Sequence, residues 1–358
     1  MLDKTDVYSK EYQEKRVAAT RRPLARICVL SAALASLAAL IAGCGGGESA
    51  SGGGESTLSL VAYSTPREAY EEIVPAFQET AAGSGIDLDQ SYAASGEQSR
   101  AVEAGLAADV VAFSLEPDIT RLVEAGMIEE GWNEDAYGGM VTDSVVVFVV
   151  REGNPENIQS WDDLLRDGIE VITPNPFTSG GAQWNIMAAY GAQLERGASE
   201  DEAVDYLREL FLEHVPVQDK SARESLQTFS AGKGDVLLAY ENEAIFAQQA
   251  GQPLDYVVPD ETILIENPVA VVGSGGNARA AQAFVDYLRT PDAQRVFGEK
   301  GYRPVVEDVL GEFDYPEPPG LFTIADLGGW ADVRTRFFDR DDSIFADIES
   351  ELGVSTDG

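Results

Sequence analysis

Cysteine and histidine are nearly absent from this chain. Its 358 residues include two cysteines, Cys28 and Cys44, and one histidine, His214. Because no cysteine follows Cys44, the remainder of the chain excludes disulfides, thiolate nucleophiles and cysteine metal sites. His214 ends a Leu-rich helical pattern, and a single histidine argues against a Ser-His-Asp triad or a zinc cluster. The sequence therefore predicts no metal, no cofactor and no catalytic residue.

Basic residues are also scarce, at 25 Lys and Arg against 62 Asp and Glu, for a net charge of −37. Residues 44–358 keep 18 of the basic and 58 of the acidic residues, a net charge of −40. Such a field argues against nucleic acid and against an anionic membrane surface as partners. It does not exclude a small anion, because surface charge is screened over about 8 Å at physiological salt and a desolvated pocket is governed by its own dipoles.

The N-terminus differs from the rest of the chain. Residues 1–41 carry seven Lys or Arg and four acids, and residues 27–43 form an apolar run slightly short for a membrane span. This pattern predicts a cleaved export signal over residues 1–43. The run ends in Ile-Ala-Gly-Cys, which resembles a lipobox with Cys44 as the lipidated first residue, and residues 20–26 loosely resemble a twin-arginine signal. A Gly-, Ser- and Glu-rich stretch then predicts a flexible tether over residues 44–56.

Short apolar runs alternate with helical patterns along the rest of the chain. This order predicts an α/β fold with mainly parallel strands. A long helical region over residues 278–300 is expected to break at Pro291, and residues 302–358 read as helices wrapped on the body. In such sheets ligands bind beyond the carboxyl ends of the strands.

Four turns that open helices share one chemical character. They offer backbone N–H groups at the positive end of a helix dipole, a place that binds small anions. Taken singly, each serine is explained as well or better by helix capping. None of the turns carries a carboxylate, so together they predict a donor-only set that prefers fully ionised sulfate to hydrogen phosphate, whose P–OH needs an acceptor. The turns are Ser64, Ser95-Gly96, Ser179-Gly180-Gly181 and Ser221-Ala222-Arg223.

Other polar residues have plain structural interpretations at this stage. Tyr240 is also interpretable as a half-buried strand residue, and Arg67 and Arg223 as members of surface salt bridges. Glu241 and Glu243 are expected on a strand as solvated or hinge contacts, since no acid pocket accompanies them that would suit a glycosidase pair.

Six ordered segments resemble the sulfate-binding proteins of ABC importers, and the resemblance spans about residues 58–345. Its specificity lies in the order of the segments, because any one of them is weak. The segments are VAYSTPRE at 61–68, QSYAASGEQ at 90–98, TPNPFTSGGA at 173–182, SAR at 221–223, GDVLLAYENEA at 234–244 and YRP at 302–304.

The resemblance implies a two-lobed periplasmic-binding-protein type II fold with hinge strands and a central anion cleft. Lobe 1 would comprise 57–147 and 265–358, with the C-terminal wrap, and lobe 2 would comprise 148–264. The family usually has Asp where Ser64 stands and Trp where Tyr240 stands. Carried over by position, the sulfate contacts would be the backbone of Ser64, the hydroxyl and backbone of Ser95, the hydroxyl of Ser179, the N–H groups of Gly180, Gly181 and Ala222, and the phenol of Tyr240, with Arg67 or Arg223 behind them.

The implied function is a lipid-anchored, monomeric, extracytoplasmic receptor that delivers sulfate to ABC permease subunits. The membrane would be contacted only through the lipid. Thiosulfate or molybdate and tungstate remain alternative ligands. A hydrolase of sulfated or phosphorylated substrates is the alternative from another class, and a sensing or adhesive protein of the same fold is a third.

Overall fold

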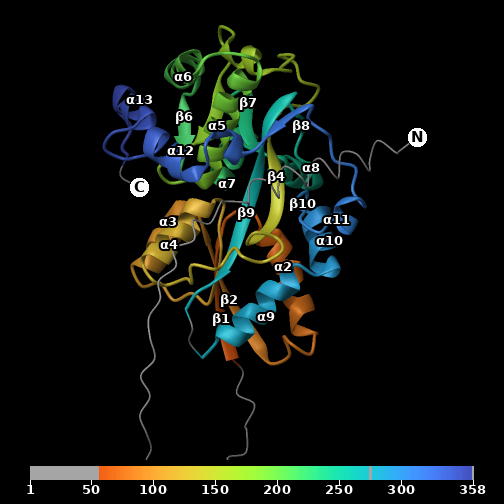
Figure 1. Cartoon of the computed structure of the whole chain (residues 1–358). Coiled ribbons are helices and arrows are strands. Elements are labelled where there is room, and N and C mark those ends of the chain that lie inside the picture. The colour runs from red at the N-terminus through yellow and green to blue at the C-terminus, as the bar shows by residue number, and fades with distance from the viewer. Residues whose placement is uncertain (1–55, 274–275, 357–358) are drawn as a thin grey trace, which may run out of the picture.

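The computed structural model describes residues 56–273 and 276–356. Cys44, the expected export signal and nearly all of the expected tether lie outside the described residues. Figure 1 shows two lobes, one above the other, joined by two long strands. The α/β class and the two-lobed architecture expected from the sequence are confirmed.

The first lobe is built on parallel strands, with β1 hydrogen-bonded between β2 and β3. Apolar side chains of β1 and of helix α2, including Leu60 and Phe77, form a buried core with α9 and α10. Helix α9 ends at Leu288 and α10 begins at Pro291, which confirms the predicted break. The elements of this lobe are β1 (Ser56–Tyr63), α2 (Arg67–Gln78), β2 (Ile86–Ala93), α3 (Ser95–Glu103), β3 (Val110–Ala112), α4 (Glu116–Glu124), α9 (Ala278–Leu288) and α10 (Pro291–Glu299).

Two long antiparallel strands, β4 (Met140–Arg151) and β9 (Glu261–Val271), connect the lobes. They pair with one another at their middle, where Val145 faces Leu264. Beyond that region β9 pairs with β3 of the first lobe, and β4 pairs with β7 of the second. Both strands are almost entirely buried and rich in apolar residues, as expected for strands covered on both faces, and they also bury Asp143 and Glu266 opposite one another.

The second lobe repeats the strand-and-helix pattern, with β5 lying parallel between β6 and β7. Helix α5 is buried along nearly its whole length, which explains why its sequence is apolar on every side. The elements of this lobe are η1 (Trp161–Leu165), β5 (Val171–Pro174), α5 (Gly180–Glu195), α6 (Glu200–Glu209), η2 (Leu210–His214), β6 (Val217–Asp219), α7 (Ala222–Ser230), β7 (Val236–Tyr240), α8 (Glu241–Gln249) and β8 (Leu254–Val257).

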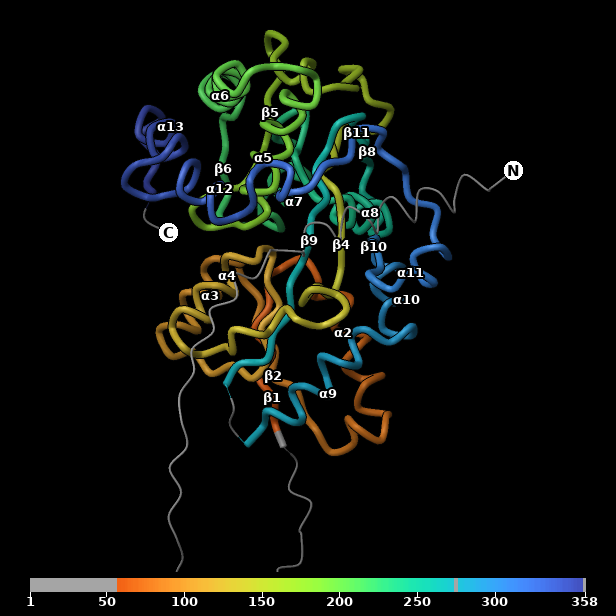
Figure 2. Tube along the Cα trace, in the orientation of Figure 1, coloured from red at the N-terminus to blue at the C-terminus, as the bar shows by residue number. Residues whose placement is uncertain are grey.

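The C-terminal segment begins beside α10 of the first lobe, then runs along the second lobe in Figure 2 and ends in helices against it. Trp330 packs edge-on against Trp184 of α5, and Phe345 packs edge-on against Phe211 of η2. This wrap therefore packs on the second lobe, whereas the sequence grouped it with the first. The elements of this segment are β10 (Arg303–Pro304), α11 (Glu307–Leu310), β11 (Gly320–Phe322), η3 (Ile324–Leu327), α12 (Trp330–Phe337) and α13 (Ile344–Leu352).

In the part of the chain that the structure describes, no helix combines the length and the apolar character that crossing a membrane requires.

Candidate functional site

The residues predicted to bind an anion lie at strand ends and helix starts that face one another between the lobes. In the first lobe Ser64 follows β1, and Ser95 is the first residue of α3 after β2. In the second lobe Ser179 precedes α5, Ala222 begins α7, and Tyr240 ends β7. The strand-end geometry of α/β sheets thus brings together turns that are far apart in the sequence.

The second-lobe members of this set are direct neighbours. A Cβ atom built on Gly181 would lie 3.4 Å from Cβ of Ala222, 3.5 Å from Oγ of Ser179 and 3.6 Å from Cε1 of Tyr240. Gly181 is therefore surrounded by Ser179, Ala222 and Tyr240. Because glycine has no side chain, its backbone N–H is left open to close approach there.

Ser114, which the sequence analysis did not single out, connects the two lobes at this point. Its Oγ lies 2.6 Å from the phenol oxygen of Tyr240, and its carbonyl accepts a hydrogen bond of 2.8 Å from the Trp184 indole. Asn267 of β9 donates to the same carbonyl at 3.1 Å. Ser114 follows β3 and precedes α4, so it repeats the order of strand, hydroxyl residue and helix found at the other turns. That order is the sequence feature by which Ser114 could have been identified as a site residue.

A buried carboxylate qualifies the donor-only expectation. The Ser95 hydroxyl donates to Oδ2 of Asp118 at 2.6 Å and accepts from the Ser114 N–H at 2.9 Å. Asp118 belongs to α4 and to none of the four turns, so the sequence of the turns does not indicate it. Burial raises the pKa of Asp118, and the Ser95 hydrogen bond and nearby arginines oppose that rise. Because a hydroxyl has one proton, Ser95 has already donated its own to Asp118, and its backbone N–H is the donor left for an anion.

Hydrogen bonding separates the serines that cap helices from those that do not. Ser221 caps α7, because its Oγ accepts from the Glu224 N–H at 3.2 Å. Ser179 stands at the N-cap of α5 but makes no side-chain capping bond, and it is only 4% exposed. Ser95 lies inside its helix, behind Ala94 at the N-cap. Capping thus accounts for Ser221 but for neither Ser95 nor Ser179.

Arg223 joins the lobes through two carboxylates. It forms a bidentate pair with Glu68 of α2 at 2.6 and 3.0 Å, and it contacts Glu243 of α8 at 2.9 and 3.0 Å. Its Nη2 also donates to the Thr65 carbonyl at 3.1 Å, which ties the turn of Ser64 to the start of α7. Burial opposes the charge of Arg223, but the carboxylates outweigh it and raise its pKa.

Three sequence-based expectations are corrected by these contacts. Glu241 and Glu243 lie at the start of α8 instead of on a strand, and both are fully buried instead of solvated. Glu241 pairs with the buried Arg303 at 2.8 Å. Arg67 is exposed, with its guanidinium 4.9 Å from the centre of the Tyr92 ring, and no salt bridge is recorded for it among the described residues.

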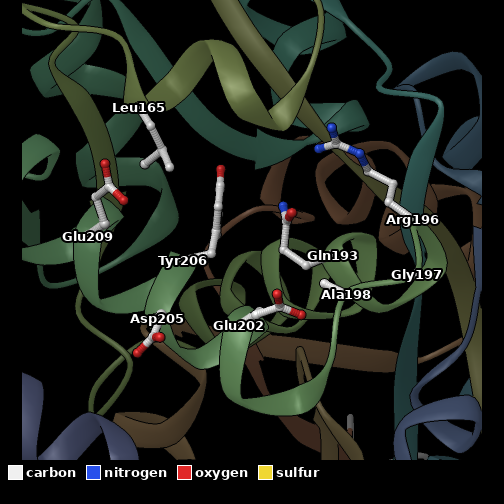
Figure 3. A pocket seen from close by; sticks show the side chains of 9 residues that line it. All are labelled: Leu165, Gln193, Arg196, Gly197, Ala198, Glu202, Asp205, Tyr206 and Glu209. Atoms are coloured by element: carbon white, nitrogen blue, oxygen red, sulfur yellow. The ribbon is translucent and has the colours of Figure 1, made fainter.

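A separate pocket on the second lobe contains none of the predicted residues. Figure 3 shows its lining from η1, α5 and α6, including Gln193, Glu202 and Tyr206. Tyr206 donates to the Trp161 carbonyl and Glu202 caps its own helix, so these polar groups are engaged structurally. Within residues 56–273 and 276–356 no cluster of three or more metal-ligating side chains occurs.

Two lobes, connecting strands and facing helix starts place the chain among two-lobed α/β proteins. Residues 58–303 match the family of bacterial extracellular solute-binding proteins, and the chain belongs to that family.

Named relatives narrow the comparison. The chain is 42% identical to a sulfate-binding protein of Synechococcus elongatus, over 86% of this chain and 92% of the relative. It is 33% identical to a thiosulfate-binding protein of Pseudomonas aeruginosa, over 79% and 89%. Among solved structures it resembles the sulfate-binding protein SubI from Mycobacterium tuberculosis, with 46% identity, a TM-score of 0.77, and coverage of 79% of this chain and 100% of that one.

Proposed function

We propose that this protein binds sulfate between its lobes and delivers it to an ABC importer. The observation that carries the proposal is the convergence of Ser179, Gly181, Ala222 and Tyr240 on one point, opposite Ser95 and Ser114 of the other lobe. The proposed ligands are the residues taken from the resemblance: Ser64, Ser95, Ser179, Gly180, Gly181, Ala222 and Tyr240. The similarity to sulfate-binding proteins supports the choice of ligand.

Closure of the cleft would couple ligand binding to the arrangement of the lobes. The anion gains all its donors only when both lobes touch it, so ligand and closed form stabilise one another. Trp184, Tyr240 and Arg223 already reach across to the first lobe in this structure. The boundaries proposed for the lobes, at 147/148 and 264/265, both fall within the two connecting strands.

The charge of the dianion would be met by helix ends and polarised N–H groups. The proposed ligands lie at the starts of α3, α5 and α7, where each helix dipole would favour a negative ligand. Arg223 is already paired with Glu68 and Glu243, so it acts by holding the start of α7 in place. Arg67 would contribute only at a distance.

Titration of the purified protein with four oxyanions tests the proposal. Sulfate is expected to bind in the micromolar range or tighter, read by calorimetry and by tryptophan fluorescence, since Trp184 lies at the contact between the lobes. Thiosulfate and molybdate test the alternative ligands, and hydrogen phosphate is expected to leave the tryptophan fluorescence unchanged. Failure of every oxyanion to bind, or a clear preference for phosphate, would refute the proposed ligand.

Delivery requires that the protein stay at the outer face of the membrane. We propose export with cleavage before Cys44, lipid attachment to that residue and action as a monomer. Cys44→Ser is expected to release the protein into the medium or the periplasm without changing sulfate affinity in vitro. Equal membrane retention of the variant and the natural chain would rule out the lipid anchor.

A further inference from the structure

Four arginines from both parts of the molecule surround a small pocket beside the proposed sulfate site. The pocket has a volume of about 50 Å³. It is lined by two of the proposed sulfate ligands, Ser179 and Gly180, and by Gly96, which follows the proposed ligand Ser95. Arg100 comes from α3 and Arg121 from α4 in the first lobe. The other two, Arg334 and Arg340, come from α12 and the residue stretch that follows it.

This concentration of positive charge is unusual for the chain. Residues 44–358 hold only 18 basic residues, and four of them line this one pocket. Asp118 is the single acidic side chain of the described residues that lines it, and its carboxyl group is held by the Ser95 hydroxyl. The pocket is therefore locally positive on a strongly negative molecule.

The arginines are only partly engaged by protein groups. Arg100 and Arg340 both donate to the Phe177 carbonyl, at 3.5 and 3.2 Å, and Arg121 has one ion pair with Glu103 at 3.4 Å. No side-chain hydrogen bond is recorded for Arg334 to any described residue. Since each guanidinium has five N–H donors, most of this donor capacity is left for a ligand. Burial lowers the pKa of Arg100, and the neighbouring Arg340 and Arg121 lower it further, while Asp118 and Glu97 only partly oppose this shift.

The size and location of the pocket restrict its ligand. A volume of about 50 Å³ holds a few waters or one small ion, and excludes a nucleotide or a peptide segment. A wider groove of about 600 Å³ adjoins it and shares Arg121, Arg334 and Arg340 with it. This groove is also lined by four acidic residues, which the small pocket lacks: Glu116, Glu124, Asp339 and Asp341. The pocket thus lies between that groove and the start of α5, where Ser179 and Gly180 line it.

We infer that these four arginines form an outer anion site, which captures an inorganic dianion such as sulfate and passes it to the inner site. The inference rests on the proposed function. Its physical reason is that the net charge of the chain repels a dianion at long range, so a local positive site increases the rate of productive encounters. The outer site does not discriminate between dianions, because guanidinium groups pair with sulfate and phosphate alike. The inner site then discriminates between sulfate and phosphate.

Stopped-flow fluorescence of the full protein with sulfate tests this site. Arg334→Gln and Arg340→Gln are each expected to lower the association rate constant on the order of tenfold at low ionic strength, with the dissociation rate constant within twofold. Arg336→Gln is the matched control, because Arg336 lies on the same helix but pairs with Glu200. Hydrogen phosphate should slow sulfate association in the natural protein more than chloride at equal ionic strength, and the Arg334 variant should lose that difference.

The outcomes separate this inference from the proposed function. If the natural protein binds sulfate and the arginine variants associate as fast as it does, the outer site is refuted and the proposed function stands. If the variants associate slowly but phosphate and chloride act equally, the arginines only attract anions at a distance and no outer site exists. If the natural protein binds no oxyanion at equilibrium, the outer site and the proposed function are both refuted.

Discussion

The serine hydroxyls of the cleft have different roles that only their hydrogen bonds distinguish. Ser221 accepts from a backbone N–H of its own helix, whereas Ser179 makes no capping bond although it occupies the same position relative to α5. Ser95 is shared between Asp118 and Ser114. A hydroxyl that is buried without a structural task is the one free to bind a ligand.

The pair Ser179→Ala and Ser221→Ala separates these roles. Ser179→Ala is expected to weaken sulfate binding about tenfold or more, as one hydrogen bond to a charged ligand is lost, with little change in melting temperature. Ser221→Ala is expected to lower stability by about 1 kcal/mol through the lost cap. Calorimetric titration and thermal melts of both variants measure the difference. If Ser179→Ala lowered the melting temperature and left sulfate affinity unchanged, the role of Ser179 would be structural.

Glu349 on α13 is expected to limit stability at neutral and alkaline pH. It is fully buried, Gln218 donates to its Oε2 at 3.1 Å, and its Oε1 has no hydrogen-bond partner among the described residues. Burial raises its pKa to about 7. The folded state therefore holds a proton that the unfolded chain loses near pH 4.5, so stability falls as pH rises from about 4.5 to 7.

Glu349→Gln should remove that penalty. The variant is expected to gain at most about 3 kcal/mol at pH 8 and nothing at pH 4, as judged by urea unfolding at both values. Asp347→Asn, at an exposed position of the same helix, serves as the control and should show no such pH-dependent gain. An equal effect of Glu349→Gln at the two pH values would contradict the titration.

At the scale of elements, the close approach of α5 to the turn before α4 determines how far the lobes can close. A Cβ atom on Gly180 would lie 2.6 Å from Ser114 Oγ and 2.8 Å from both Ser114 Cβ and Leu115 Cγ. Such distances cannot be met without displacing the turn. Glycine at this position therefore permits contact between a helix start of one lobe and a strand end of the other.

Gly180→Ala is expected to hold the cleft partly open. Sulfate affinity should fall by at least tenfold, and X-ray scattering should show a smaller contraction on adding sulfate than in the natural protein. Alanine favours helix over glycine by about 1 kcal/mol, so reduced stability would not explain the loss. Gly276→Ala is the control, because a Cβ there meets no atom within 4 Å. Unchanged affinity of Gly180→Ala would show that the approach does not limit closure.

The sequence predicted most of these elements because their signals are local. The alternation of strands and helices and the break at Pro291 follow from periodicity and proline alone. Asp118 could not be found from the sequence, because its importance comes from a hydrogen bond between α3 and α4. Ser114 carried the local signal of the other turns, but its contact with Tyr240 arises only when the lobes meet. The first-lobe assignment of the C-terminal helices likewise missed that Trp330 packs on Trp184, a contact 146 positions apart along the chain.

At the scale of the whole molecule, contacts between the lobes centre on Arg223. Its side chain is 17% exposed, and it pairs with Glu68 of the first lobe and with the 1%-exposed Glu243 of the second. An exposed pair, Lys220 with Glu97, also crosses between the lobes at 2.8 Å. Removing one member of a buried pair costs about 3–5 kcal/mol, whereas an exposed pair contributes about 0–1 kcal/mol. Arg223 is therefore the contact on which the closed form depends.

Arg223→Gln should weaken sulfate binding in a pH-dependent way. The substitution leaves the Glu243 carboxylate buried without its cation, so affinity at pH 8 is expected to fall at least tenfold. Burial already raises the pKa of Glu243, and losing Arg223 raises it further. At pH 5.5 a larger share of Glu243 is protonated, the uncompensated charge is relieved, and part of the affinity should return.

Calorimetric titrations at the two pH values measure this, with Lys220→Gln expected to stay within twofold of the natural protein at both. A loss of affinity that is equal at pH 8 and pH 5.5 would mean that Arg223 contributes contacts other than neutralising Glu243.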